Sequence, residues 1–244
     1  MPVIPHIGHW RSVARPPDLP PGGLHLWKLH TGNGGAPPAP LWSLLSLGEF
    51  ERAARLRFDH HRERFVRAHA GLRRILSGYL GSAPEAIGFR YGDAGKPRLE
   101  GETGLEFNLT TSGDLALVAL SLGTPLGVDC EQVSDRGDMV AIADRMFTPE
   151  QTARIAAASP EERLRRFHLA WTALEAEVKA NGCGLPGRDR PAARSTPRIR
   201  HCVPELGFIA AVACEHLPPV GDWVTMTLRT DPAIRHGSRP SFRL

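Results

Sequence analysis

A chain of 244 residues, 41% of them hydrophobic, is long enough for one large domain or two closely packed small ones. No apolar run reaches the length of a membrane span and the first residues lack a signal-peptide pattern, so we expect a cytoplasmic protein with no membrane partner. A net charge of +4, spread along the chain, does not indicate nucleic-acid binding but suits an acidic partner or a phosphorylated ligand. The four cysteines form no CxxC pair, which argues against a zinc site or a disulfide framework.

The first half of the chain passes from strand-like to helix-like text and back. Residues 1–23 are rich in Pro and Gly and are predicted to be irregular, whereas "LHLWKLHTG", from Leu24, alternates like a strand. Apolar residues recur at helical spacing between 44 and 80, and the Gly-Ser-Ala-Pro at 81–84 closes that helical region. Short strands are expected around 89–91, 106–109 and 115–121.

The second half repeats this plan. The sequence predicts a strand ending at 129–131, helices within 138–158 and 161–180, a polar loop at 186–200, and strands near 206–214 and 222–228. We therefore predict an α+β fold of two similar α/β halves, residues 24–122 and 123–244, which meet near 121–126.

Two carboxylates follow an apolar run in "PLGVDCEQV", residues 125–133. Residues two apart in a strand face the same way, so Asp129 and Glu131 are expected to project together while Cys130 points to the opposite face. Paired carboxylates repel unless a cation lies between them, and oxygen ligands at this spacing suit Mg²⁺. The alternative is a solvated strand end.

A second polar group lies in "FHLAWTALEAEVKANGCGL", residues 167–185. Trp171, Glu175 and Lys179 recur every four residues and therefore share one helical face. The simplest interpretation of Glu175 and Lys179 is an exposed i,i+4 salt bridge.

Two further stretches carry polar groups that have ordinary structural explanations. In "GKPRLEGETGLEFNLTTSGDLALVAL", residues 95–120, the "NLTTSG" supplies hydroxyls and amides that suit either a phosphate or a polar hairpin. The amphipathic "RFVRAHAGLRRILSGYLG", residues 64–81, carries arginines that are ordinarily explained as solubilising charge: Arg64, Arg67, Arg73 and Arg74.

Taken in chain order, these pieces resemble the motifs of the Sfp-type 4′-phosphopantetheinyl transferases, over roughly residues 44–185. The motifs are an arginine-containing helix, G-K-P, F-N-[IL]-[ST]-H-S, G-[VI]-D-x-E and W-x-x-K-E-x-x-x-K. They stand here as Arg73 with Ile75-Leu76, Gly95 to Pro97, Phe107 to Ser112, Gly127 to Glu131, and Trp171 to Lys179.

The resemblance implies two pseudo-symmetric α/β halves with coenzyme A and Mg²⁺ in the cleft between them. A serine hydroxyl of an acyl or peptidyl carrier protein would attack the β-phosphorus of coenzyme A, so that the apo carrier becomes holo and 3′,5′-ADP is released. The carriers would belong to fatty-acid, polyketide or nonribosomal peptide assembly, and the enzyme would be a monomer.

The same resemblance implies the catalytic and metal-binding residues. Asp129, Glu131 and Glu175 would hold Mg²⁺ against the pyrophosphate, which physics supports because displacement at phosphorus needs charge neutralisation. The base for the serine proton would be Glu175 first and Glu131 second, directly or through water. Lys179 would contact phosphate.

Coenzyme A contacts follow from the resemblance as well. Lys96 and Arg64 fall where the family contacts the 3′-phosphate, and Arg52 or Arg55 would add to the positive field. Thr110 takes the small hydroxyl position of F-N-[IL]-[ST]-H-S.

Two positions depart from the motifs. Leu174 replaces a lysine, and Thr111 replaces the histidine of F-N-[IL]-[ST]-H-S. Losing one charge-assisted bond to phosphate costs about 1.5–3 kcal/mol, so Thr111 predicts weaker coenzyme A binding. One alternative is therefore a weakened relative that binds coenzyme A or a carrier protein without efficient transfer. Another is a metal-dependent nuclease or phosphohydrolase built on Asp129 and Glu131.

Overall fold

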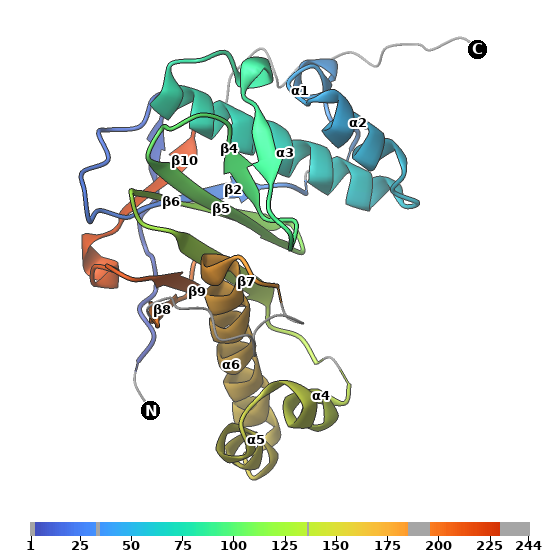
Figure 1. Cartoon of the computed structure of the whole chain (residues 1–244). Coiled ribbons are helices and arrows are strands. Elements are labelled where there is room, and N and C mark those ends of the chain that lie inside the picture. Colours follow the sequence, from blue (N-terminus) through green and yellow to red (C-terminus); the bar gives the residue numbers. More distant parts are fainter. Residues whose placement is uncertain (1–2, 33–34, 136, 185–195, 230–244) are drawn as a thin grey trace.

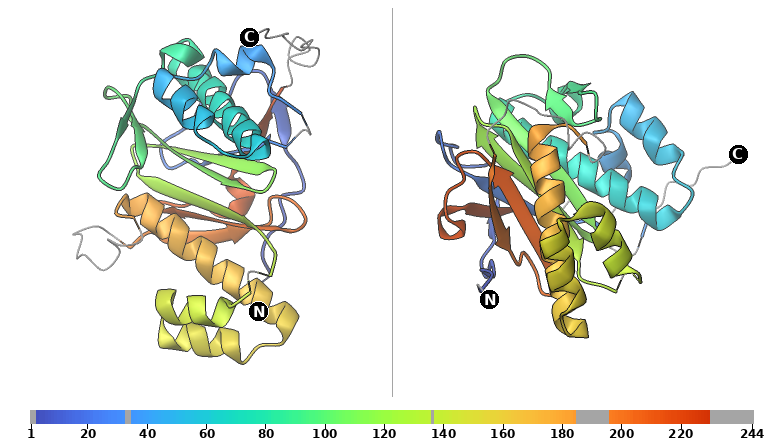
Figure 2. Two further views of the ribbon diagram at one scale, coloured as in Figure 1. Left: turned by 90° about the vertical axis from the view of Figure 1, so that its right-hand side faces the viewer. Right: turned by 60° about the horizontal axis from the view of Figure 1, so that its bottom comes forward.

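The protein is described here by a computed structural model that covers residues 3–32, 35–135, 137–184 and 196–229. The predicted α+β class is confirmed. Four layers follow one another in Figure 1: helix α3 (Asp59–Leu80), a five-stranded sheet, a three-stranded sheet, and helix α6 (Pro160–Asn181). Each long helix has 22 residues and covers the outer face of its sheet, as the left-hand view of Figure 2 also shows.

The larger sheet is built from both ends of the chain. Its strand order is β1-β10-β2-β6-β5, where β1 pairs parallel with β10, β10 pairs parallel with β2, and the remaining pairs are antiparallel. The strands are β1 (Arg11–Val13), β10 (Val224–Leu228), β2 (His25–His30), β6 (Leu115–Leu122) and β5 (Leu105–Ser112).

Helix α3 packs on the outer face of this sheet. Its apolar stripe, including Leu72, Ile75 and Leu76, meets Trp27 of β2 and Val118 of β6 in one buried cluster. The helix ends at Gly81, whose positive φ of 67° is a left-handed cap that side chains disfavour. Smaller elements surround α3: α1 (Ala39–Trp42), α2 (Leu47–Ala54), a 3-10 turn (Pro84–Ala86) and the hairpin of β3 (Phe89–Tyr91) and β4 (Pro97–Leu99).

The smaller sheet has the antiparallel order β7-β9-β8, with β7 (Leu126–Gln132), β9 (Phe208–Cys214) and β8 (Arg198–Cys202). Between β7 and β9 the chain forms α4 (Met139–Met146), α5 (Pro149–Ala156), α6 and strand β8. A 3-10 turn (Val220–Asp222) leads into β10.

The main core lies between the two sheets. Leu26 and Leu117 of the larger sheet meet Val128, Cys130 and Val212 of the smaller one in a single buried cluster. Cys130 is 1% exposed and faces this core, as the two-residue period of a strand predicts. Gly127, Asp129 and Glu131 therefore face the other way, toward α6.

Three features differ from the sequence prediction. The segment 1–23 is not wholly irregular, because β1 pairs with β10; three residues are too short a run to show alternation. Strand β8 begins within the predicted loop 186–200, where arginines at 198 and 200 mask the pattern. Residues 186–195 of that loop lie outside the described residues. Strand β10, which belongs to the predicted second half, joins the sheet of the first half.

Within the described residues, no helix is both long and apolar enough to cross a membrane.

The predicted helical region 44–80 is divided into two helices, because α2 ends at its cap Arg55 and α3 begins at Asp59.

Candidate functional site

A close contact between β7 and α6 sets the geometry of the acidic site. A Cβ on Gly127 would lie 2.0 Å from the carbonyl oxygen of Ala176 and 2.5 Å from the backbone nitrogen of Ala180. Ala176 and Ala180 in turn pack on Ala211 and Ala213 of β9. Small side chains on both elements therefore let α6 lie directly on the strand that carries Asp129 and Glu131.

Asp129 and Lys179 form an ion pair across this contact. Lys179 Nζ donates to Asp129 Oδ1 at 2.6 Å and lies 3.4 Å from the carbonyl oxygen of Val128. The interpretation of Glu175 and Lys179 as an exposed helical salt bridge is thus wrong, because β7 presents a buried carboxylate to Lys179. A lysine on the helix instead neutralises a carboxylate on the strand.

Asp129 is 4% exposed and strongly affected by its surroundings. Thr110 Oγ1 donates to Oδ1 at 3.1 Å, whereas Oδ2 is buried and has no hydrogen-bond partner. The pKa of Asp129 is raised to about 6: burial raises it most, the charge and hydrogen bond of Lys179 lower it, and the carboxylates of Glu131 and Glu175 raise it. Glu131 and Glu175 thus add negative charge around a carboxylate oxygen that lacks a partner.

Side chains of β5 connect this strand to β7 where no backbone ladder joins them. Asn108 Oδ1 accepts from the backbone amide of Val128 at 2.8 Å, and Ser112 Oγ donates to Glu131 Oε2 at 2.8 Å. The backbone amide of Gln132 donates to the same Ser112 oxygen at 2.9 Å. The roles of Asn108 and Ser112 were not predicted from the sequence, although their spacing with Thr110 places all three on one face of the strand.

The fit of these carboxylates to a divalent cation depends on their arrangement and on their donor atoms. In the part of the chain that the structure describes, no group of three or more His, Cys, Asp and Glu side chains is arranged closely enough to hold a metal ion. The donor chemistry nevertheless fits, since Asp129 Oδ2 is a buried carboxylate oxygen without a partner and Glu131 and Glu175 raise the pKa of Asp129 through their negative charge. Asp129 offers the oxygen donor around which such a site would be built, with Glu131 and Glu175 as its further carboxylates.

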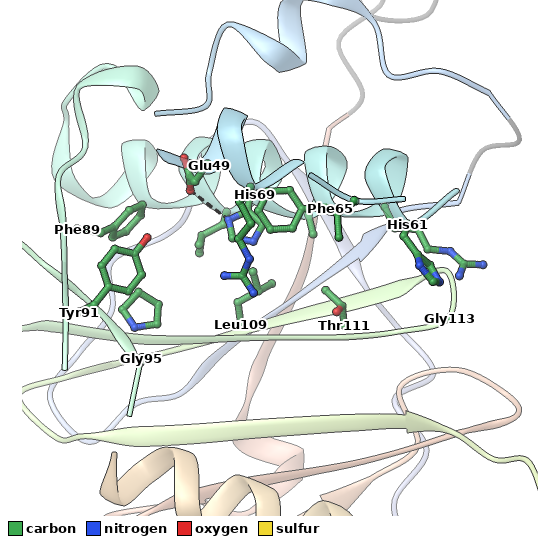
Figure 3. Close-up of a pocket in the computed structure, with 16 residues that line it drawn as sticks. Glu49, His61, Phe65, His69, Phe89, Tyr91, Gly95, Leu109, Thr111 and Gly113 are labelled. Atoms are coloured by element: carbon green, nitrogen blue, oxygen red, sulfur yellow. Dashed lines mark hydrogen bonds and ion pairs between the residues drawn. The ribbon is translucent and has the colours of Figure 1, made fainter. Parts of the chain in front are cut away.

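A cavity of about 490 Å³ lies on the opposite face of β5, below α3. Figure 3 shows its roof of α3 side chains, its floor of β5, and the β3–β4 hairpin at one end. Cationic and imidazole side chains gather in its lining (Arg52, His61, Arg64 and His69), together with aromatic rings (Phe65, Phe89 and Tyr91). Such a lining suits a ligand that combines phosphates with a planar ring.

The predicted coenzyme A residues divide between the cavity and other places. Arg64 and Thr111 line the cavity, and Arg64 Nε donates to Asp114 Oδ1 at 2.7 Å. Thr110 is turned to Asp129 on the other face of β5.

Two predicted residues lie outside the cavity. Lys96 is 9% exposed and donates from Nζ to the carbonyl oxygen of Leu126 at 2.8 Å, although its neighbours Gly95 and Pro97 do line the cavity. Arg55 is exposed at the end of α2, and Arg52 is the α2 arginine that reaches the lining.

Arg73 is not a solubilising charge, which corrects that interpretation. Its side chain is 1% exposed, and Nε donates to Glu49 Oε2 at 2.7 Å. Nη1 donates to the carbonyl oxygens of Pro84 and Ile87 at 2.9 and 3.0 Å. Arg73 therefore fixes α2, α3 and the following turn to one another.

Comparison with known proteins agrees with this architecture. The family model of the 4′-phosphopantetheinyl transferase superfamily matches residues 125–218, which contain β7, α6 and the smaller sheet. The 4′-phosphopantetheinyl transferase HetI of Nostoc sp. is 32% identical over 218 residues, which are 82% of this chain and 92% of that protein. The 4′-phosphopantetheinyl transferase AcpT of Salmonella typhi is 36% identical over 108 residues, covering 44% of this chain and 55% of that protein. The 4′-phosphopantetheinyl transferase of Bacillus subtilis is 27% identical over 138 residues, covering 55% of this chain and 60% of that protein. The chain therefore belongs to the 4′-phosphopantetheinyl transferase superfamily and is a transferase enzyme of that family.

Proposed function

We propose that this protein transfers the 4′-phosphopantetheine group of coenzyme A to a serine hydroxyl of an acyl or peptidyl carrier protein, with Mg²⁺, and releases 3′,5′-ADP. The observation that carries the proposal is the ion pair of buried Asp129 with the partly exposed Lys179, beside Glu131 and Glu175. This group and the cation-lined cavity share strand β5, through the neighbouring residues Thr110 and Thr111. The Sfp-type assignment within the superfamily is part of the proposal.

In this proposal the cavity binds coenzyme A. Its arginines and histidines face the phosphates, and its aromatic rings accommodate the adenine. Thr111 contributes a hydroxyl to this lining and Arg64 contributes a guanidinium. Lys96 lies outside the lining and stabilises the site through its hydrogen bond to the carbonyl oxygen of Leu126. Arg55 keeps at most a long-range electrostatic role, because it lies outside the lining.

The acidic site carries out the transfer. Asp129, Glu131 and Glu175 would hold Mg²⁺, which when bound neutralises charge on the pyrophosphate oxygens. Glu175, or Glu131 in its place, accepts the proton of the carrier serine. The serine oxygen forms a bond to the β-phosphorus, the bond from that phosphorus to the bridging oxygen breaks, and 3′,5′-ADP leaves. Lys179 Nζ, 2.6 Å from Asp129, offsets negative charge as the bond breaks.

The test is the intact mass of purified apo carrier domains after incubation with the protein, coenzyme A and Mg²⁺. The expected result is a gain of one phosphopantetheine mass, lost in Glu175→Gln and on chelation of the metal. Glu177→Gln is the matched control, because Glu177 lies on the same helix but on another face. No gain on any carrier, with the fold intact, would contradict the proposal.

A second candidate is a weakened relative that binds coenzyme A or a carrier without efficient transfer. It is favoured by Thr111, which lines the cavity but brings no charge. Tight coenzyme A binding without a mass gain would select it. The membership of the chain in the 4′-phosphopantetheinyl transferase superfamily argues against the alternative of a metal-dependent nuclease or phosphohydrolase. The cytoplasmic setting and the monomeric state stay predictions.

A further inference from the structure

We infer that His69, oriented by Glu49, donates a hydrogen bond to a phosphate group of coenzyme A in the cavity. The inference rests on the proposed function and adds a binding residue that none of the sequence motifs indicated. It starts from a carboxylate–imidazole pair at the junction of α2, α3 and the cavity, shown by the dashed line in Figure 3.

Glu49 fixes which nitrogen of His69 carries a proton. Its side chain is 4% exposed, Oε1 lies 3.1 Å from His69 Nδ1, and Oε2 accepts from Arg73 Nε at 2.7 Å. Burial disfavours the carboxylate, but the hydrogen bonds of His69 and the Ser46 amide and the charge of Arg73 outweigh it and lower the pKa of Glu49 to about 2. An ionised carboxylate only accepts, so Nδ1 of His69 donates to it and Nε2 is left for a ligand.

The imidazole ring is held in place from a second side. It stacks on Phe65, with ring centroids 3.9 Å apart and an angle of 24° between the planes. The guanidinium carbon of Arg52 lies 5.4 Å from the centre of the same phenyl ring. His69 is nevertheless 21% exposed and lines the cavity, so its ring is oriented and still accessible.

The cavity contains other charged and titratable groups besides Glu49 and His69. They are Arg52 on α2, His61 and Arg64 on α3, and Tyr91 on β3, with Arg73 behind Glu49. Arg64 already pairs with Asp114. Thr111, on the cavity floor, offers a hydroxyl without charge. In the imidazolium form both ring nitrogens are donors, so Nε2 donates to a phosphate while Nδ1 donates to Glu49.

The experiment titrates the full chain calorimetrically with coenzyme A and with 3′-dephospho-coenzyme A, at pH 6 and pH 8. We expect His69→Gln to weaken coenzyme A binding about tenfold at pH 6 and less at pH 8. His69→Arg should restore affinity at both pH values, since it carries a permanent charge. The matched control is His216→Gln, whose side chain is 70% exposed beyond β9. A loss confined to coenzyme A assigns the 3′-phosphate, and an equal loss for both ligands assigns the pyrophosphate.

Three results would overturn the inference. Wild-type affinity of His69→Gln at both pH values, with carrier transfer intact, would reject the role of His69 and leave the proposed function standing. If His69→Gln weakens coenzyme A binding and His69→Arg does not restore the affinity, the effect of His69 comes from its stacking on Phe65 and not from a bond to phosphate. If the wild-type protein binds neither ligand, the inference and the proposed cavity fall together, while the mass assay still reports separately on transfer.

Discussion

Thr110 and Thr111 are neighbours in β5 whose side chains lie on opposite faces of the strand: Thr110 Oγ1 donates to Asp129 Oδ1 at 3.1 Å, whereas Thr111 lines the cavity below α3. The alternation of a strand thus divides one short motif between the acidic site and the ligand cavity. Substitutions at the two positions should therefore separate chemistry from coenzyme A binding.

Thr111→His is expected to lower the Michaelis constant for coenzyme A. An imidazolium adds a charge-assisted bond worth about 1.5–3 kcal/mol, roughly ten- to a hundredfold in affinity. Steady-state kinetics with varied coenzyme A measure the change, with Thr196→His as an exposed control. An unchanged or raised value would count against a phosphate near position 111.

Ser112→Ala should lower kcat about tenfold with little change in the Michaelis constant for coenzyme A. Ser112 donates to Glu131 at 2.8 Å, and without it the carboxylate loses its orientation while the cavity stays as it was. Ser112→Thr keeps the hydroxyl and should retain most of the activity. The kcat of both variants is compared, and equal losses in both would contradict a positioning role.

The fold was predictable where patterns are local. Alternation predicted the strand around residues 25–30, continuous apolar runs predicted those around 115–122 and 126–132, and the helical period predicted α3 and α6. Strands β1 and β8 were missed, because three residues and an arginine-rich edge carry little pattern. The pairing of β10 with β2 was also missed, since its register is set by residues about 200 positions away.

The acidic site was predictable in part. The two-residue period placed Asp129 and Glu131 on one face and Cys130 in the core. The partner of Lys179 was not predictable, because helix spacing shows only the neighbour four residues away and not the strand beneath. The burial of Lys96 and Arg73 likewise depends on partners in other elements: Lys96 bonds to Leu126 of β7, and Arg73 bonds to Glu49 of α2.

Gly127→Ala should destabilise the protein by more than about 2 kcal/mol, because the added methyl overlaps the backbone of α6 at Ala176 and Ala180. Chemical denaturation measures the free energy of unfolding. Gly48→Ala is the control: no atom lies within 4 Å of its Cβ position in α2, and the change should stabilise by about 0.5–1 kcal/mol. Equal stability of the two variants would show that α6 does not rest on β7 as described.

Glu49→Gln should remove a pH-dependent share of stability. The folded pKa of Glu49 is about 2, below its ordinary value of 4.5, so its ionised form stabilises the fold above pH 4.5 and this contribution is lost as pH falls toward 2. The difference corresponds to about 3 kcal/mol at neutral pH. Unfolding measured from pH 2 to 7 should show the variant and the wild type converging at the acid end; a constant difference would contradict this assignment.

Asp129→Asn should have opposite effects on stability and activity. Burial holds the folded pKa of Asp129 at about 6, above its ordinary value of 3.8, so the carboxyl contributes most to stability below pH 3.8 and loses that contribution as pH rises through 6. At pH 8 in chelator, ionised Asp129 therefore costs up to about 3 kcal/mol, and asparagine removes this cost while Thr110 keeps an acceptor.

We expect Asp129→Asn to raise the melting temperature in chelator at pH 8, to show no such gain at pH 4, and to abolish carrier modification. Asp144→Asn, on the exposed face of α4, is the control and should change neither quantity. A lower melting temperature at pH 8 would mean that the ion pair with Lys179 outweighs burial. The combination of lost activity and gained stability is the signature of a carboxylate that the fold keeps at an energetic cost because the reaction requires it.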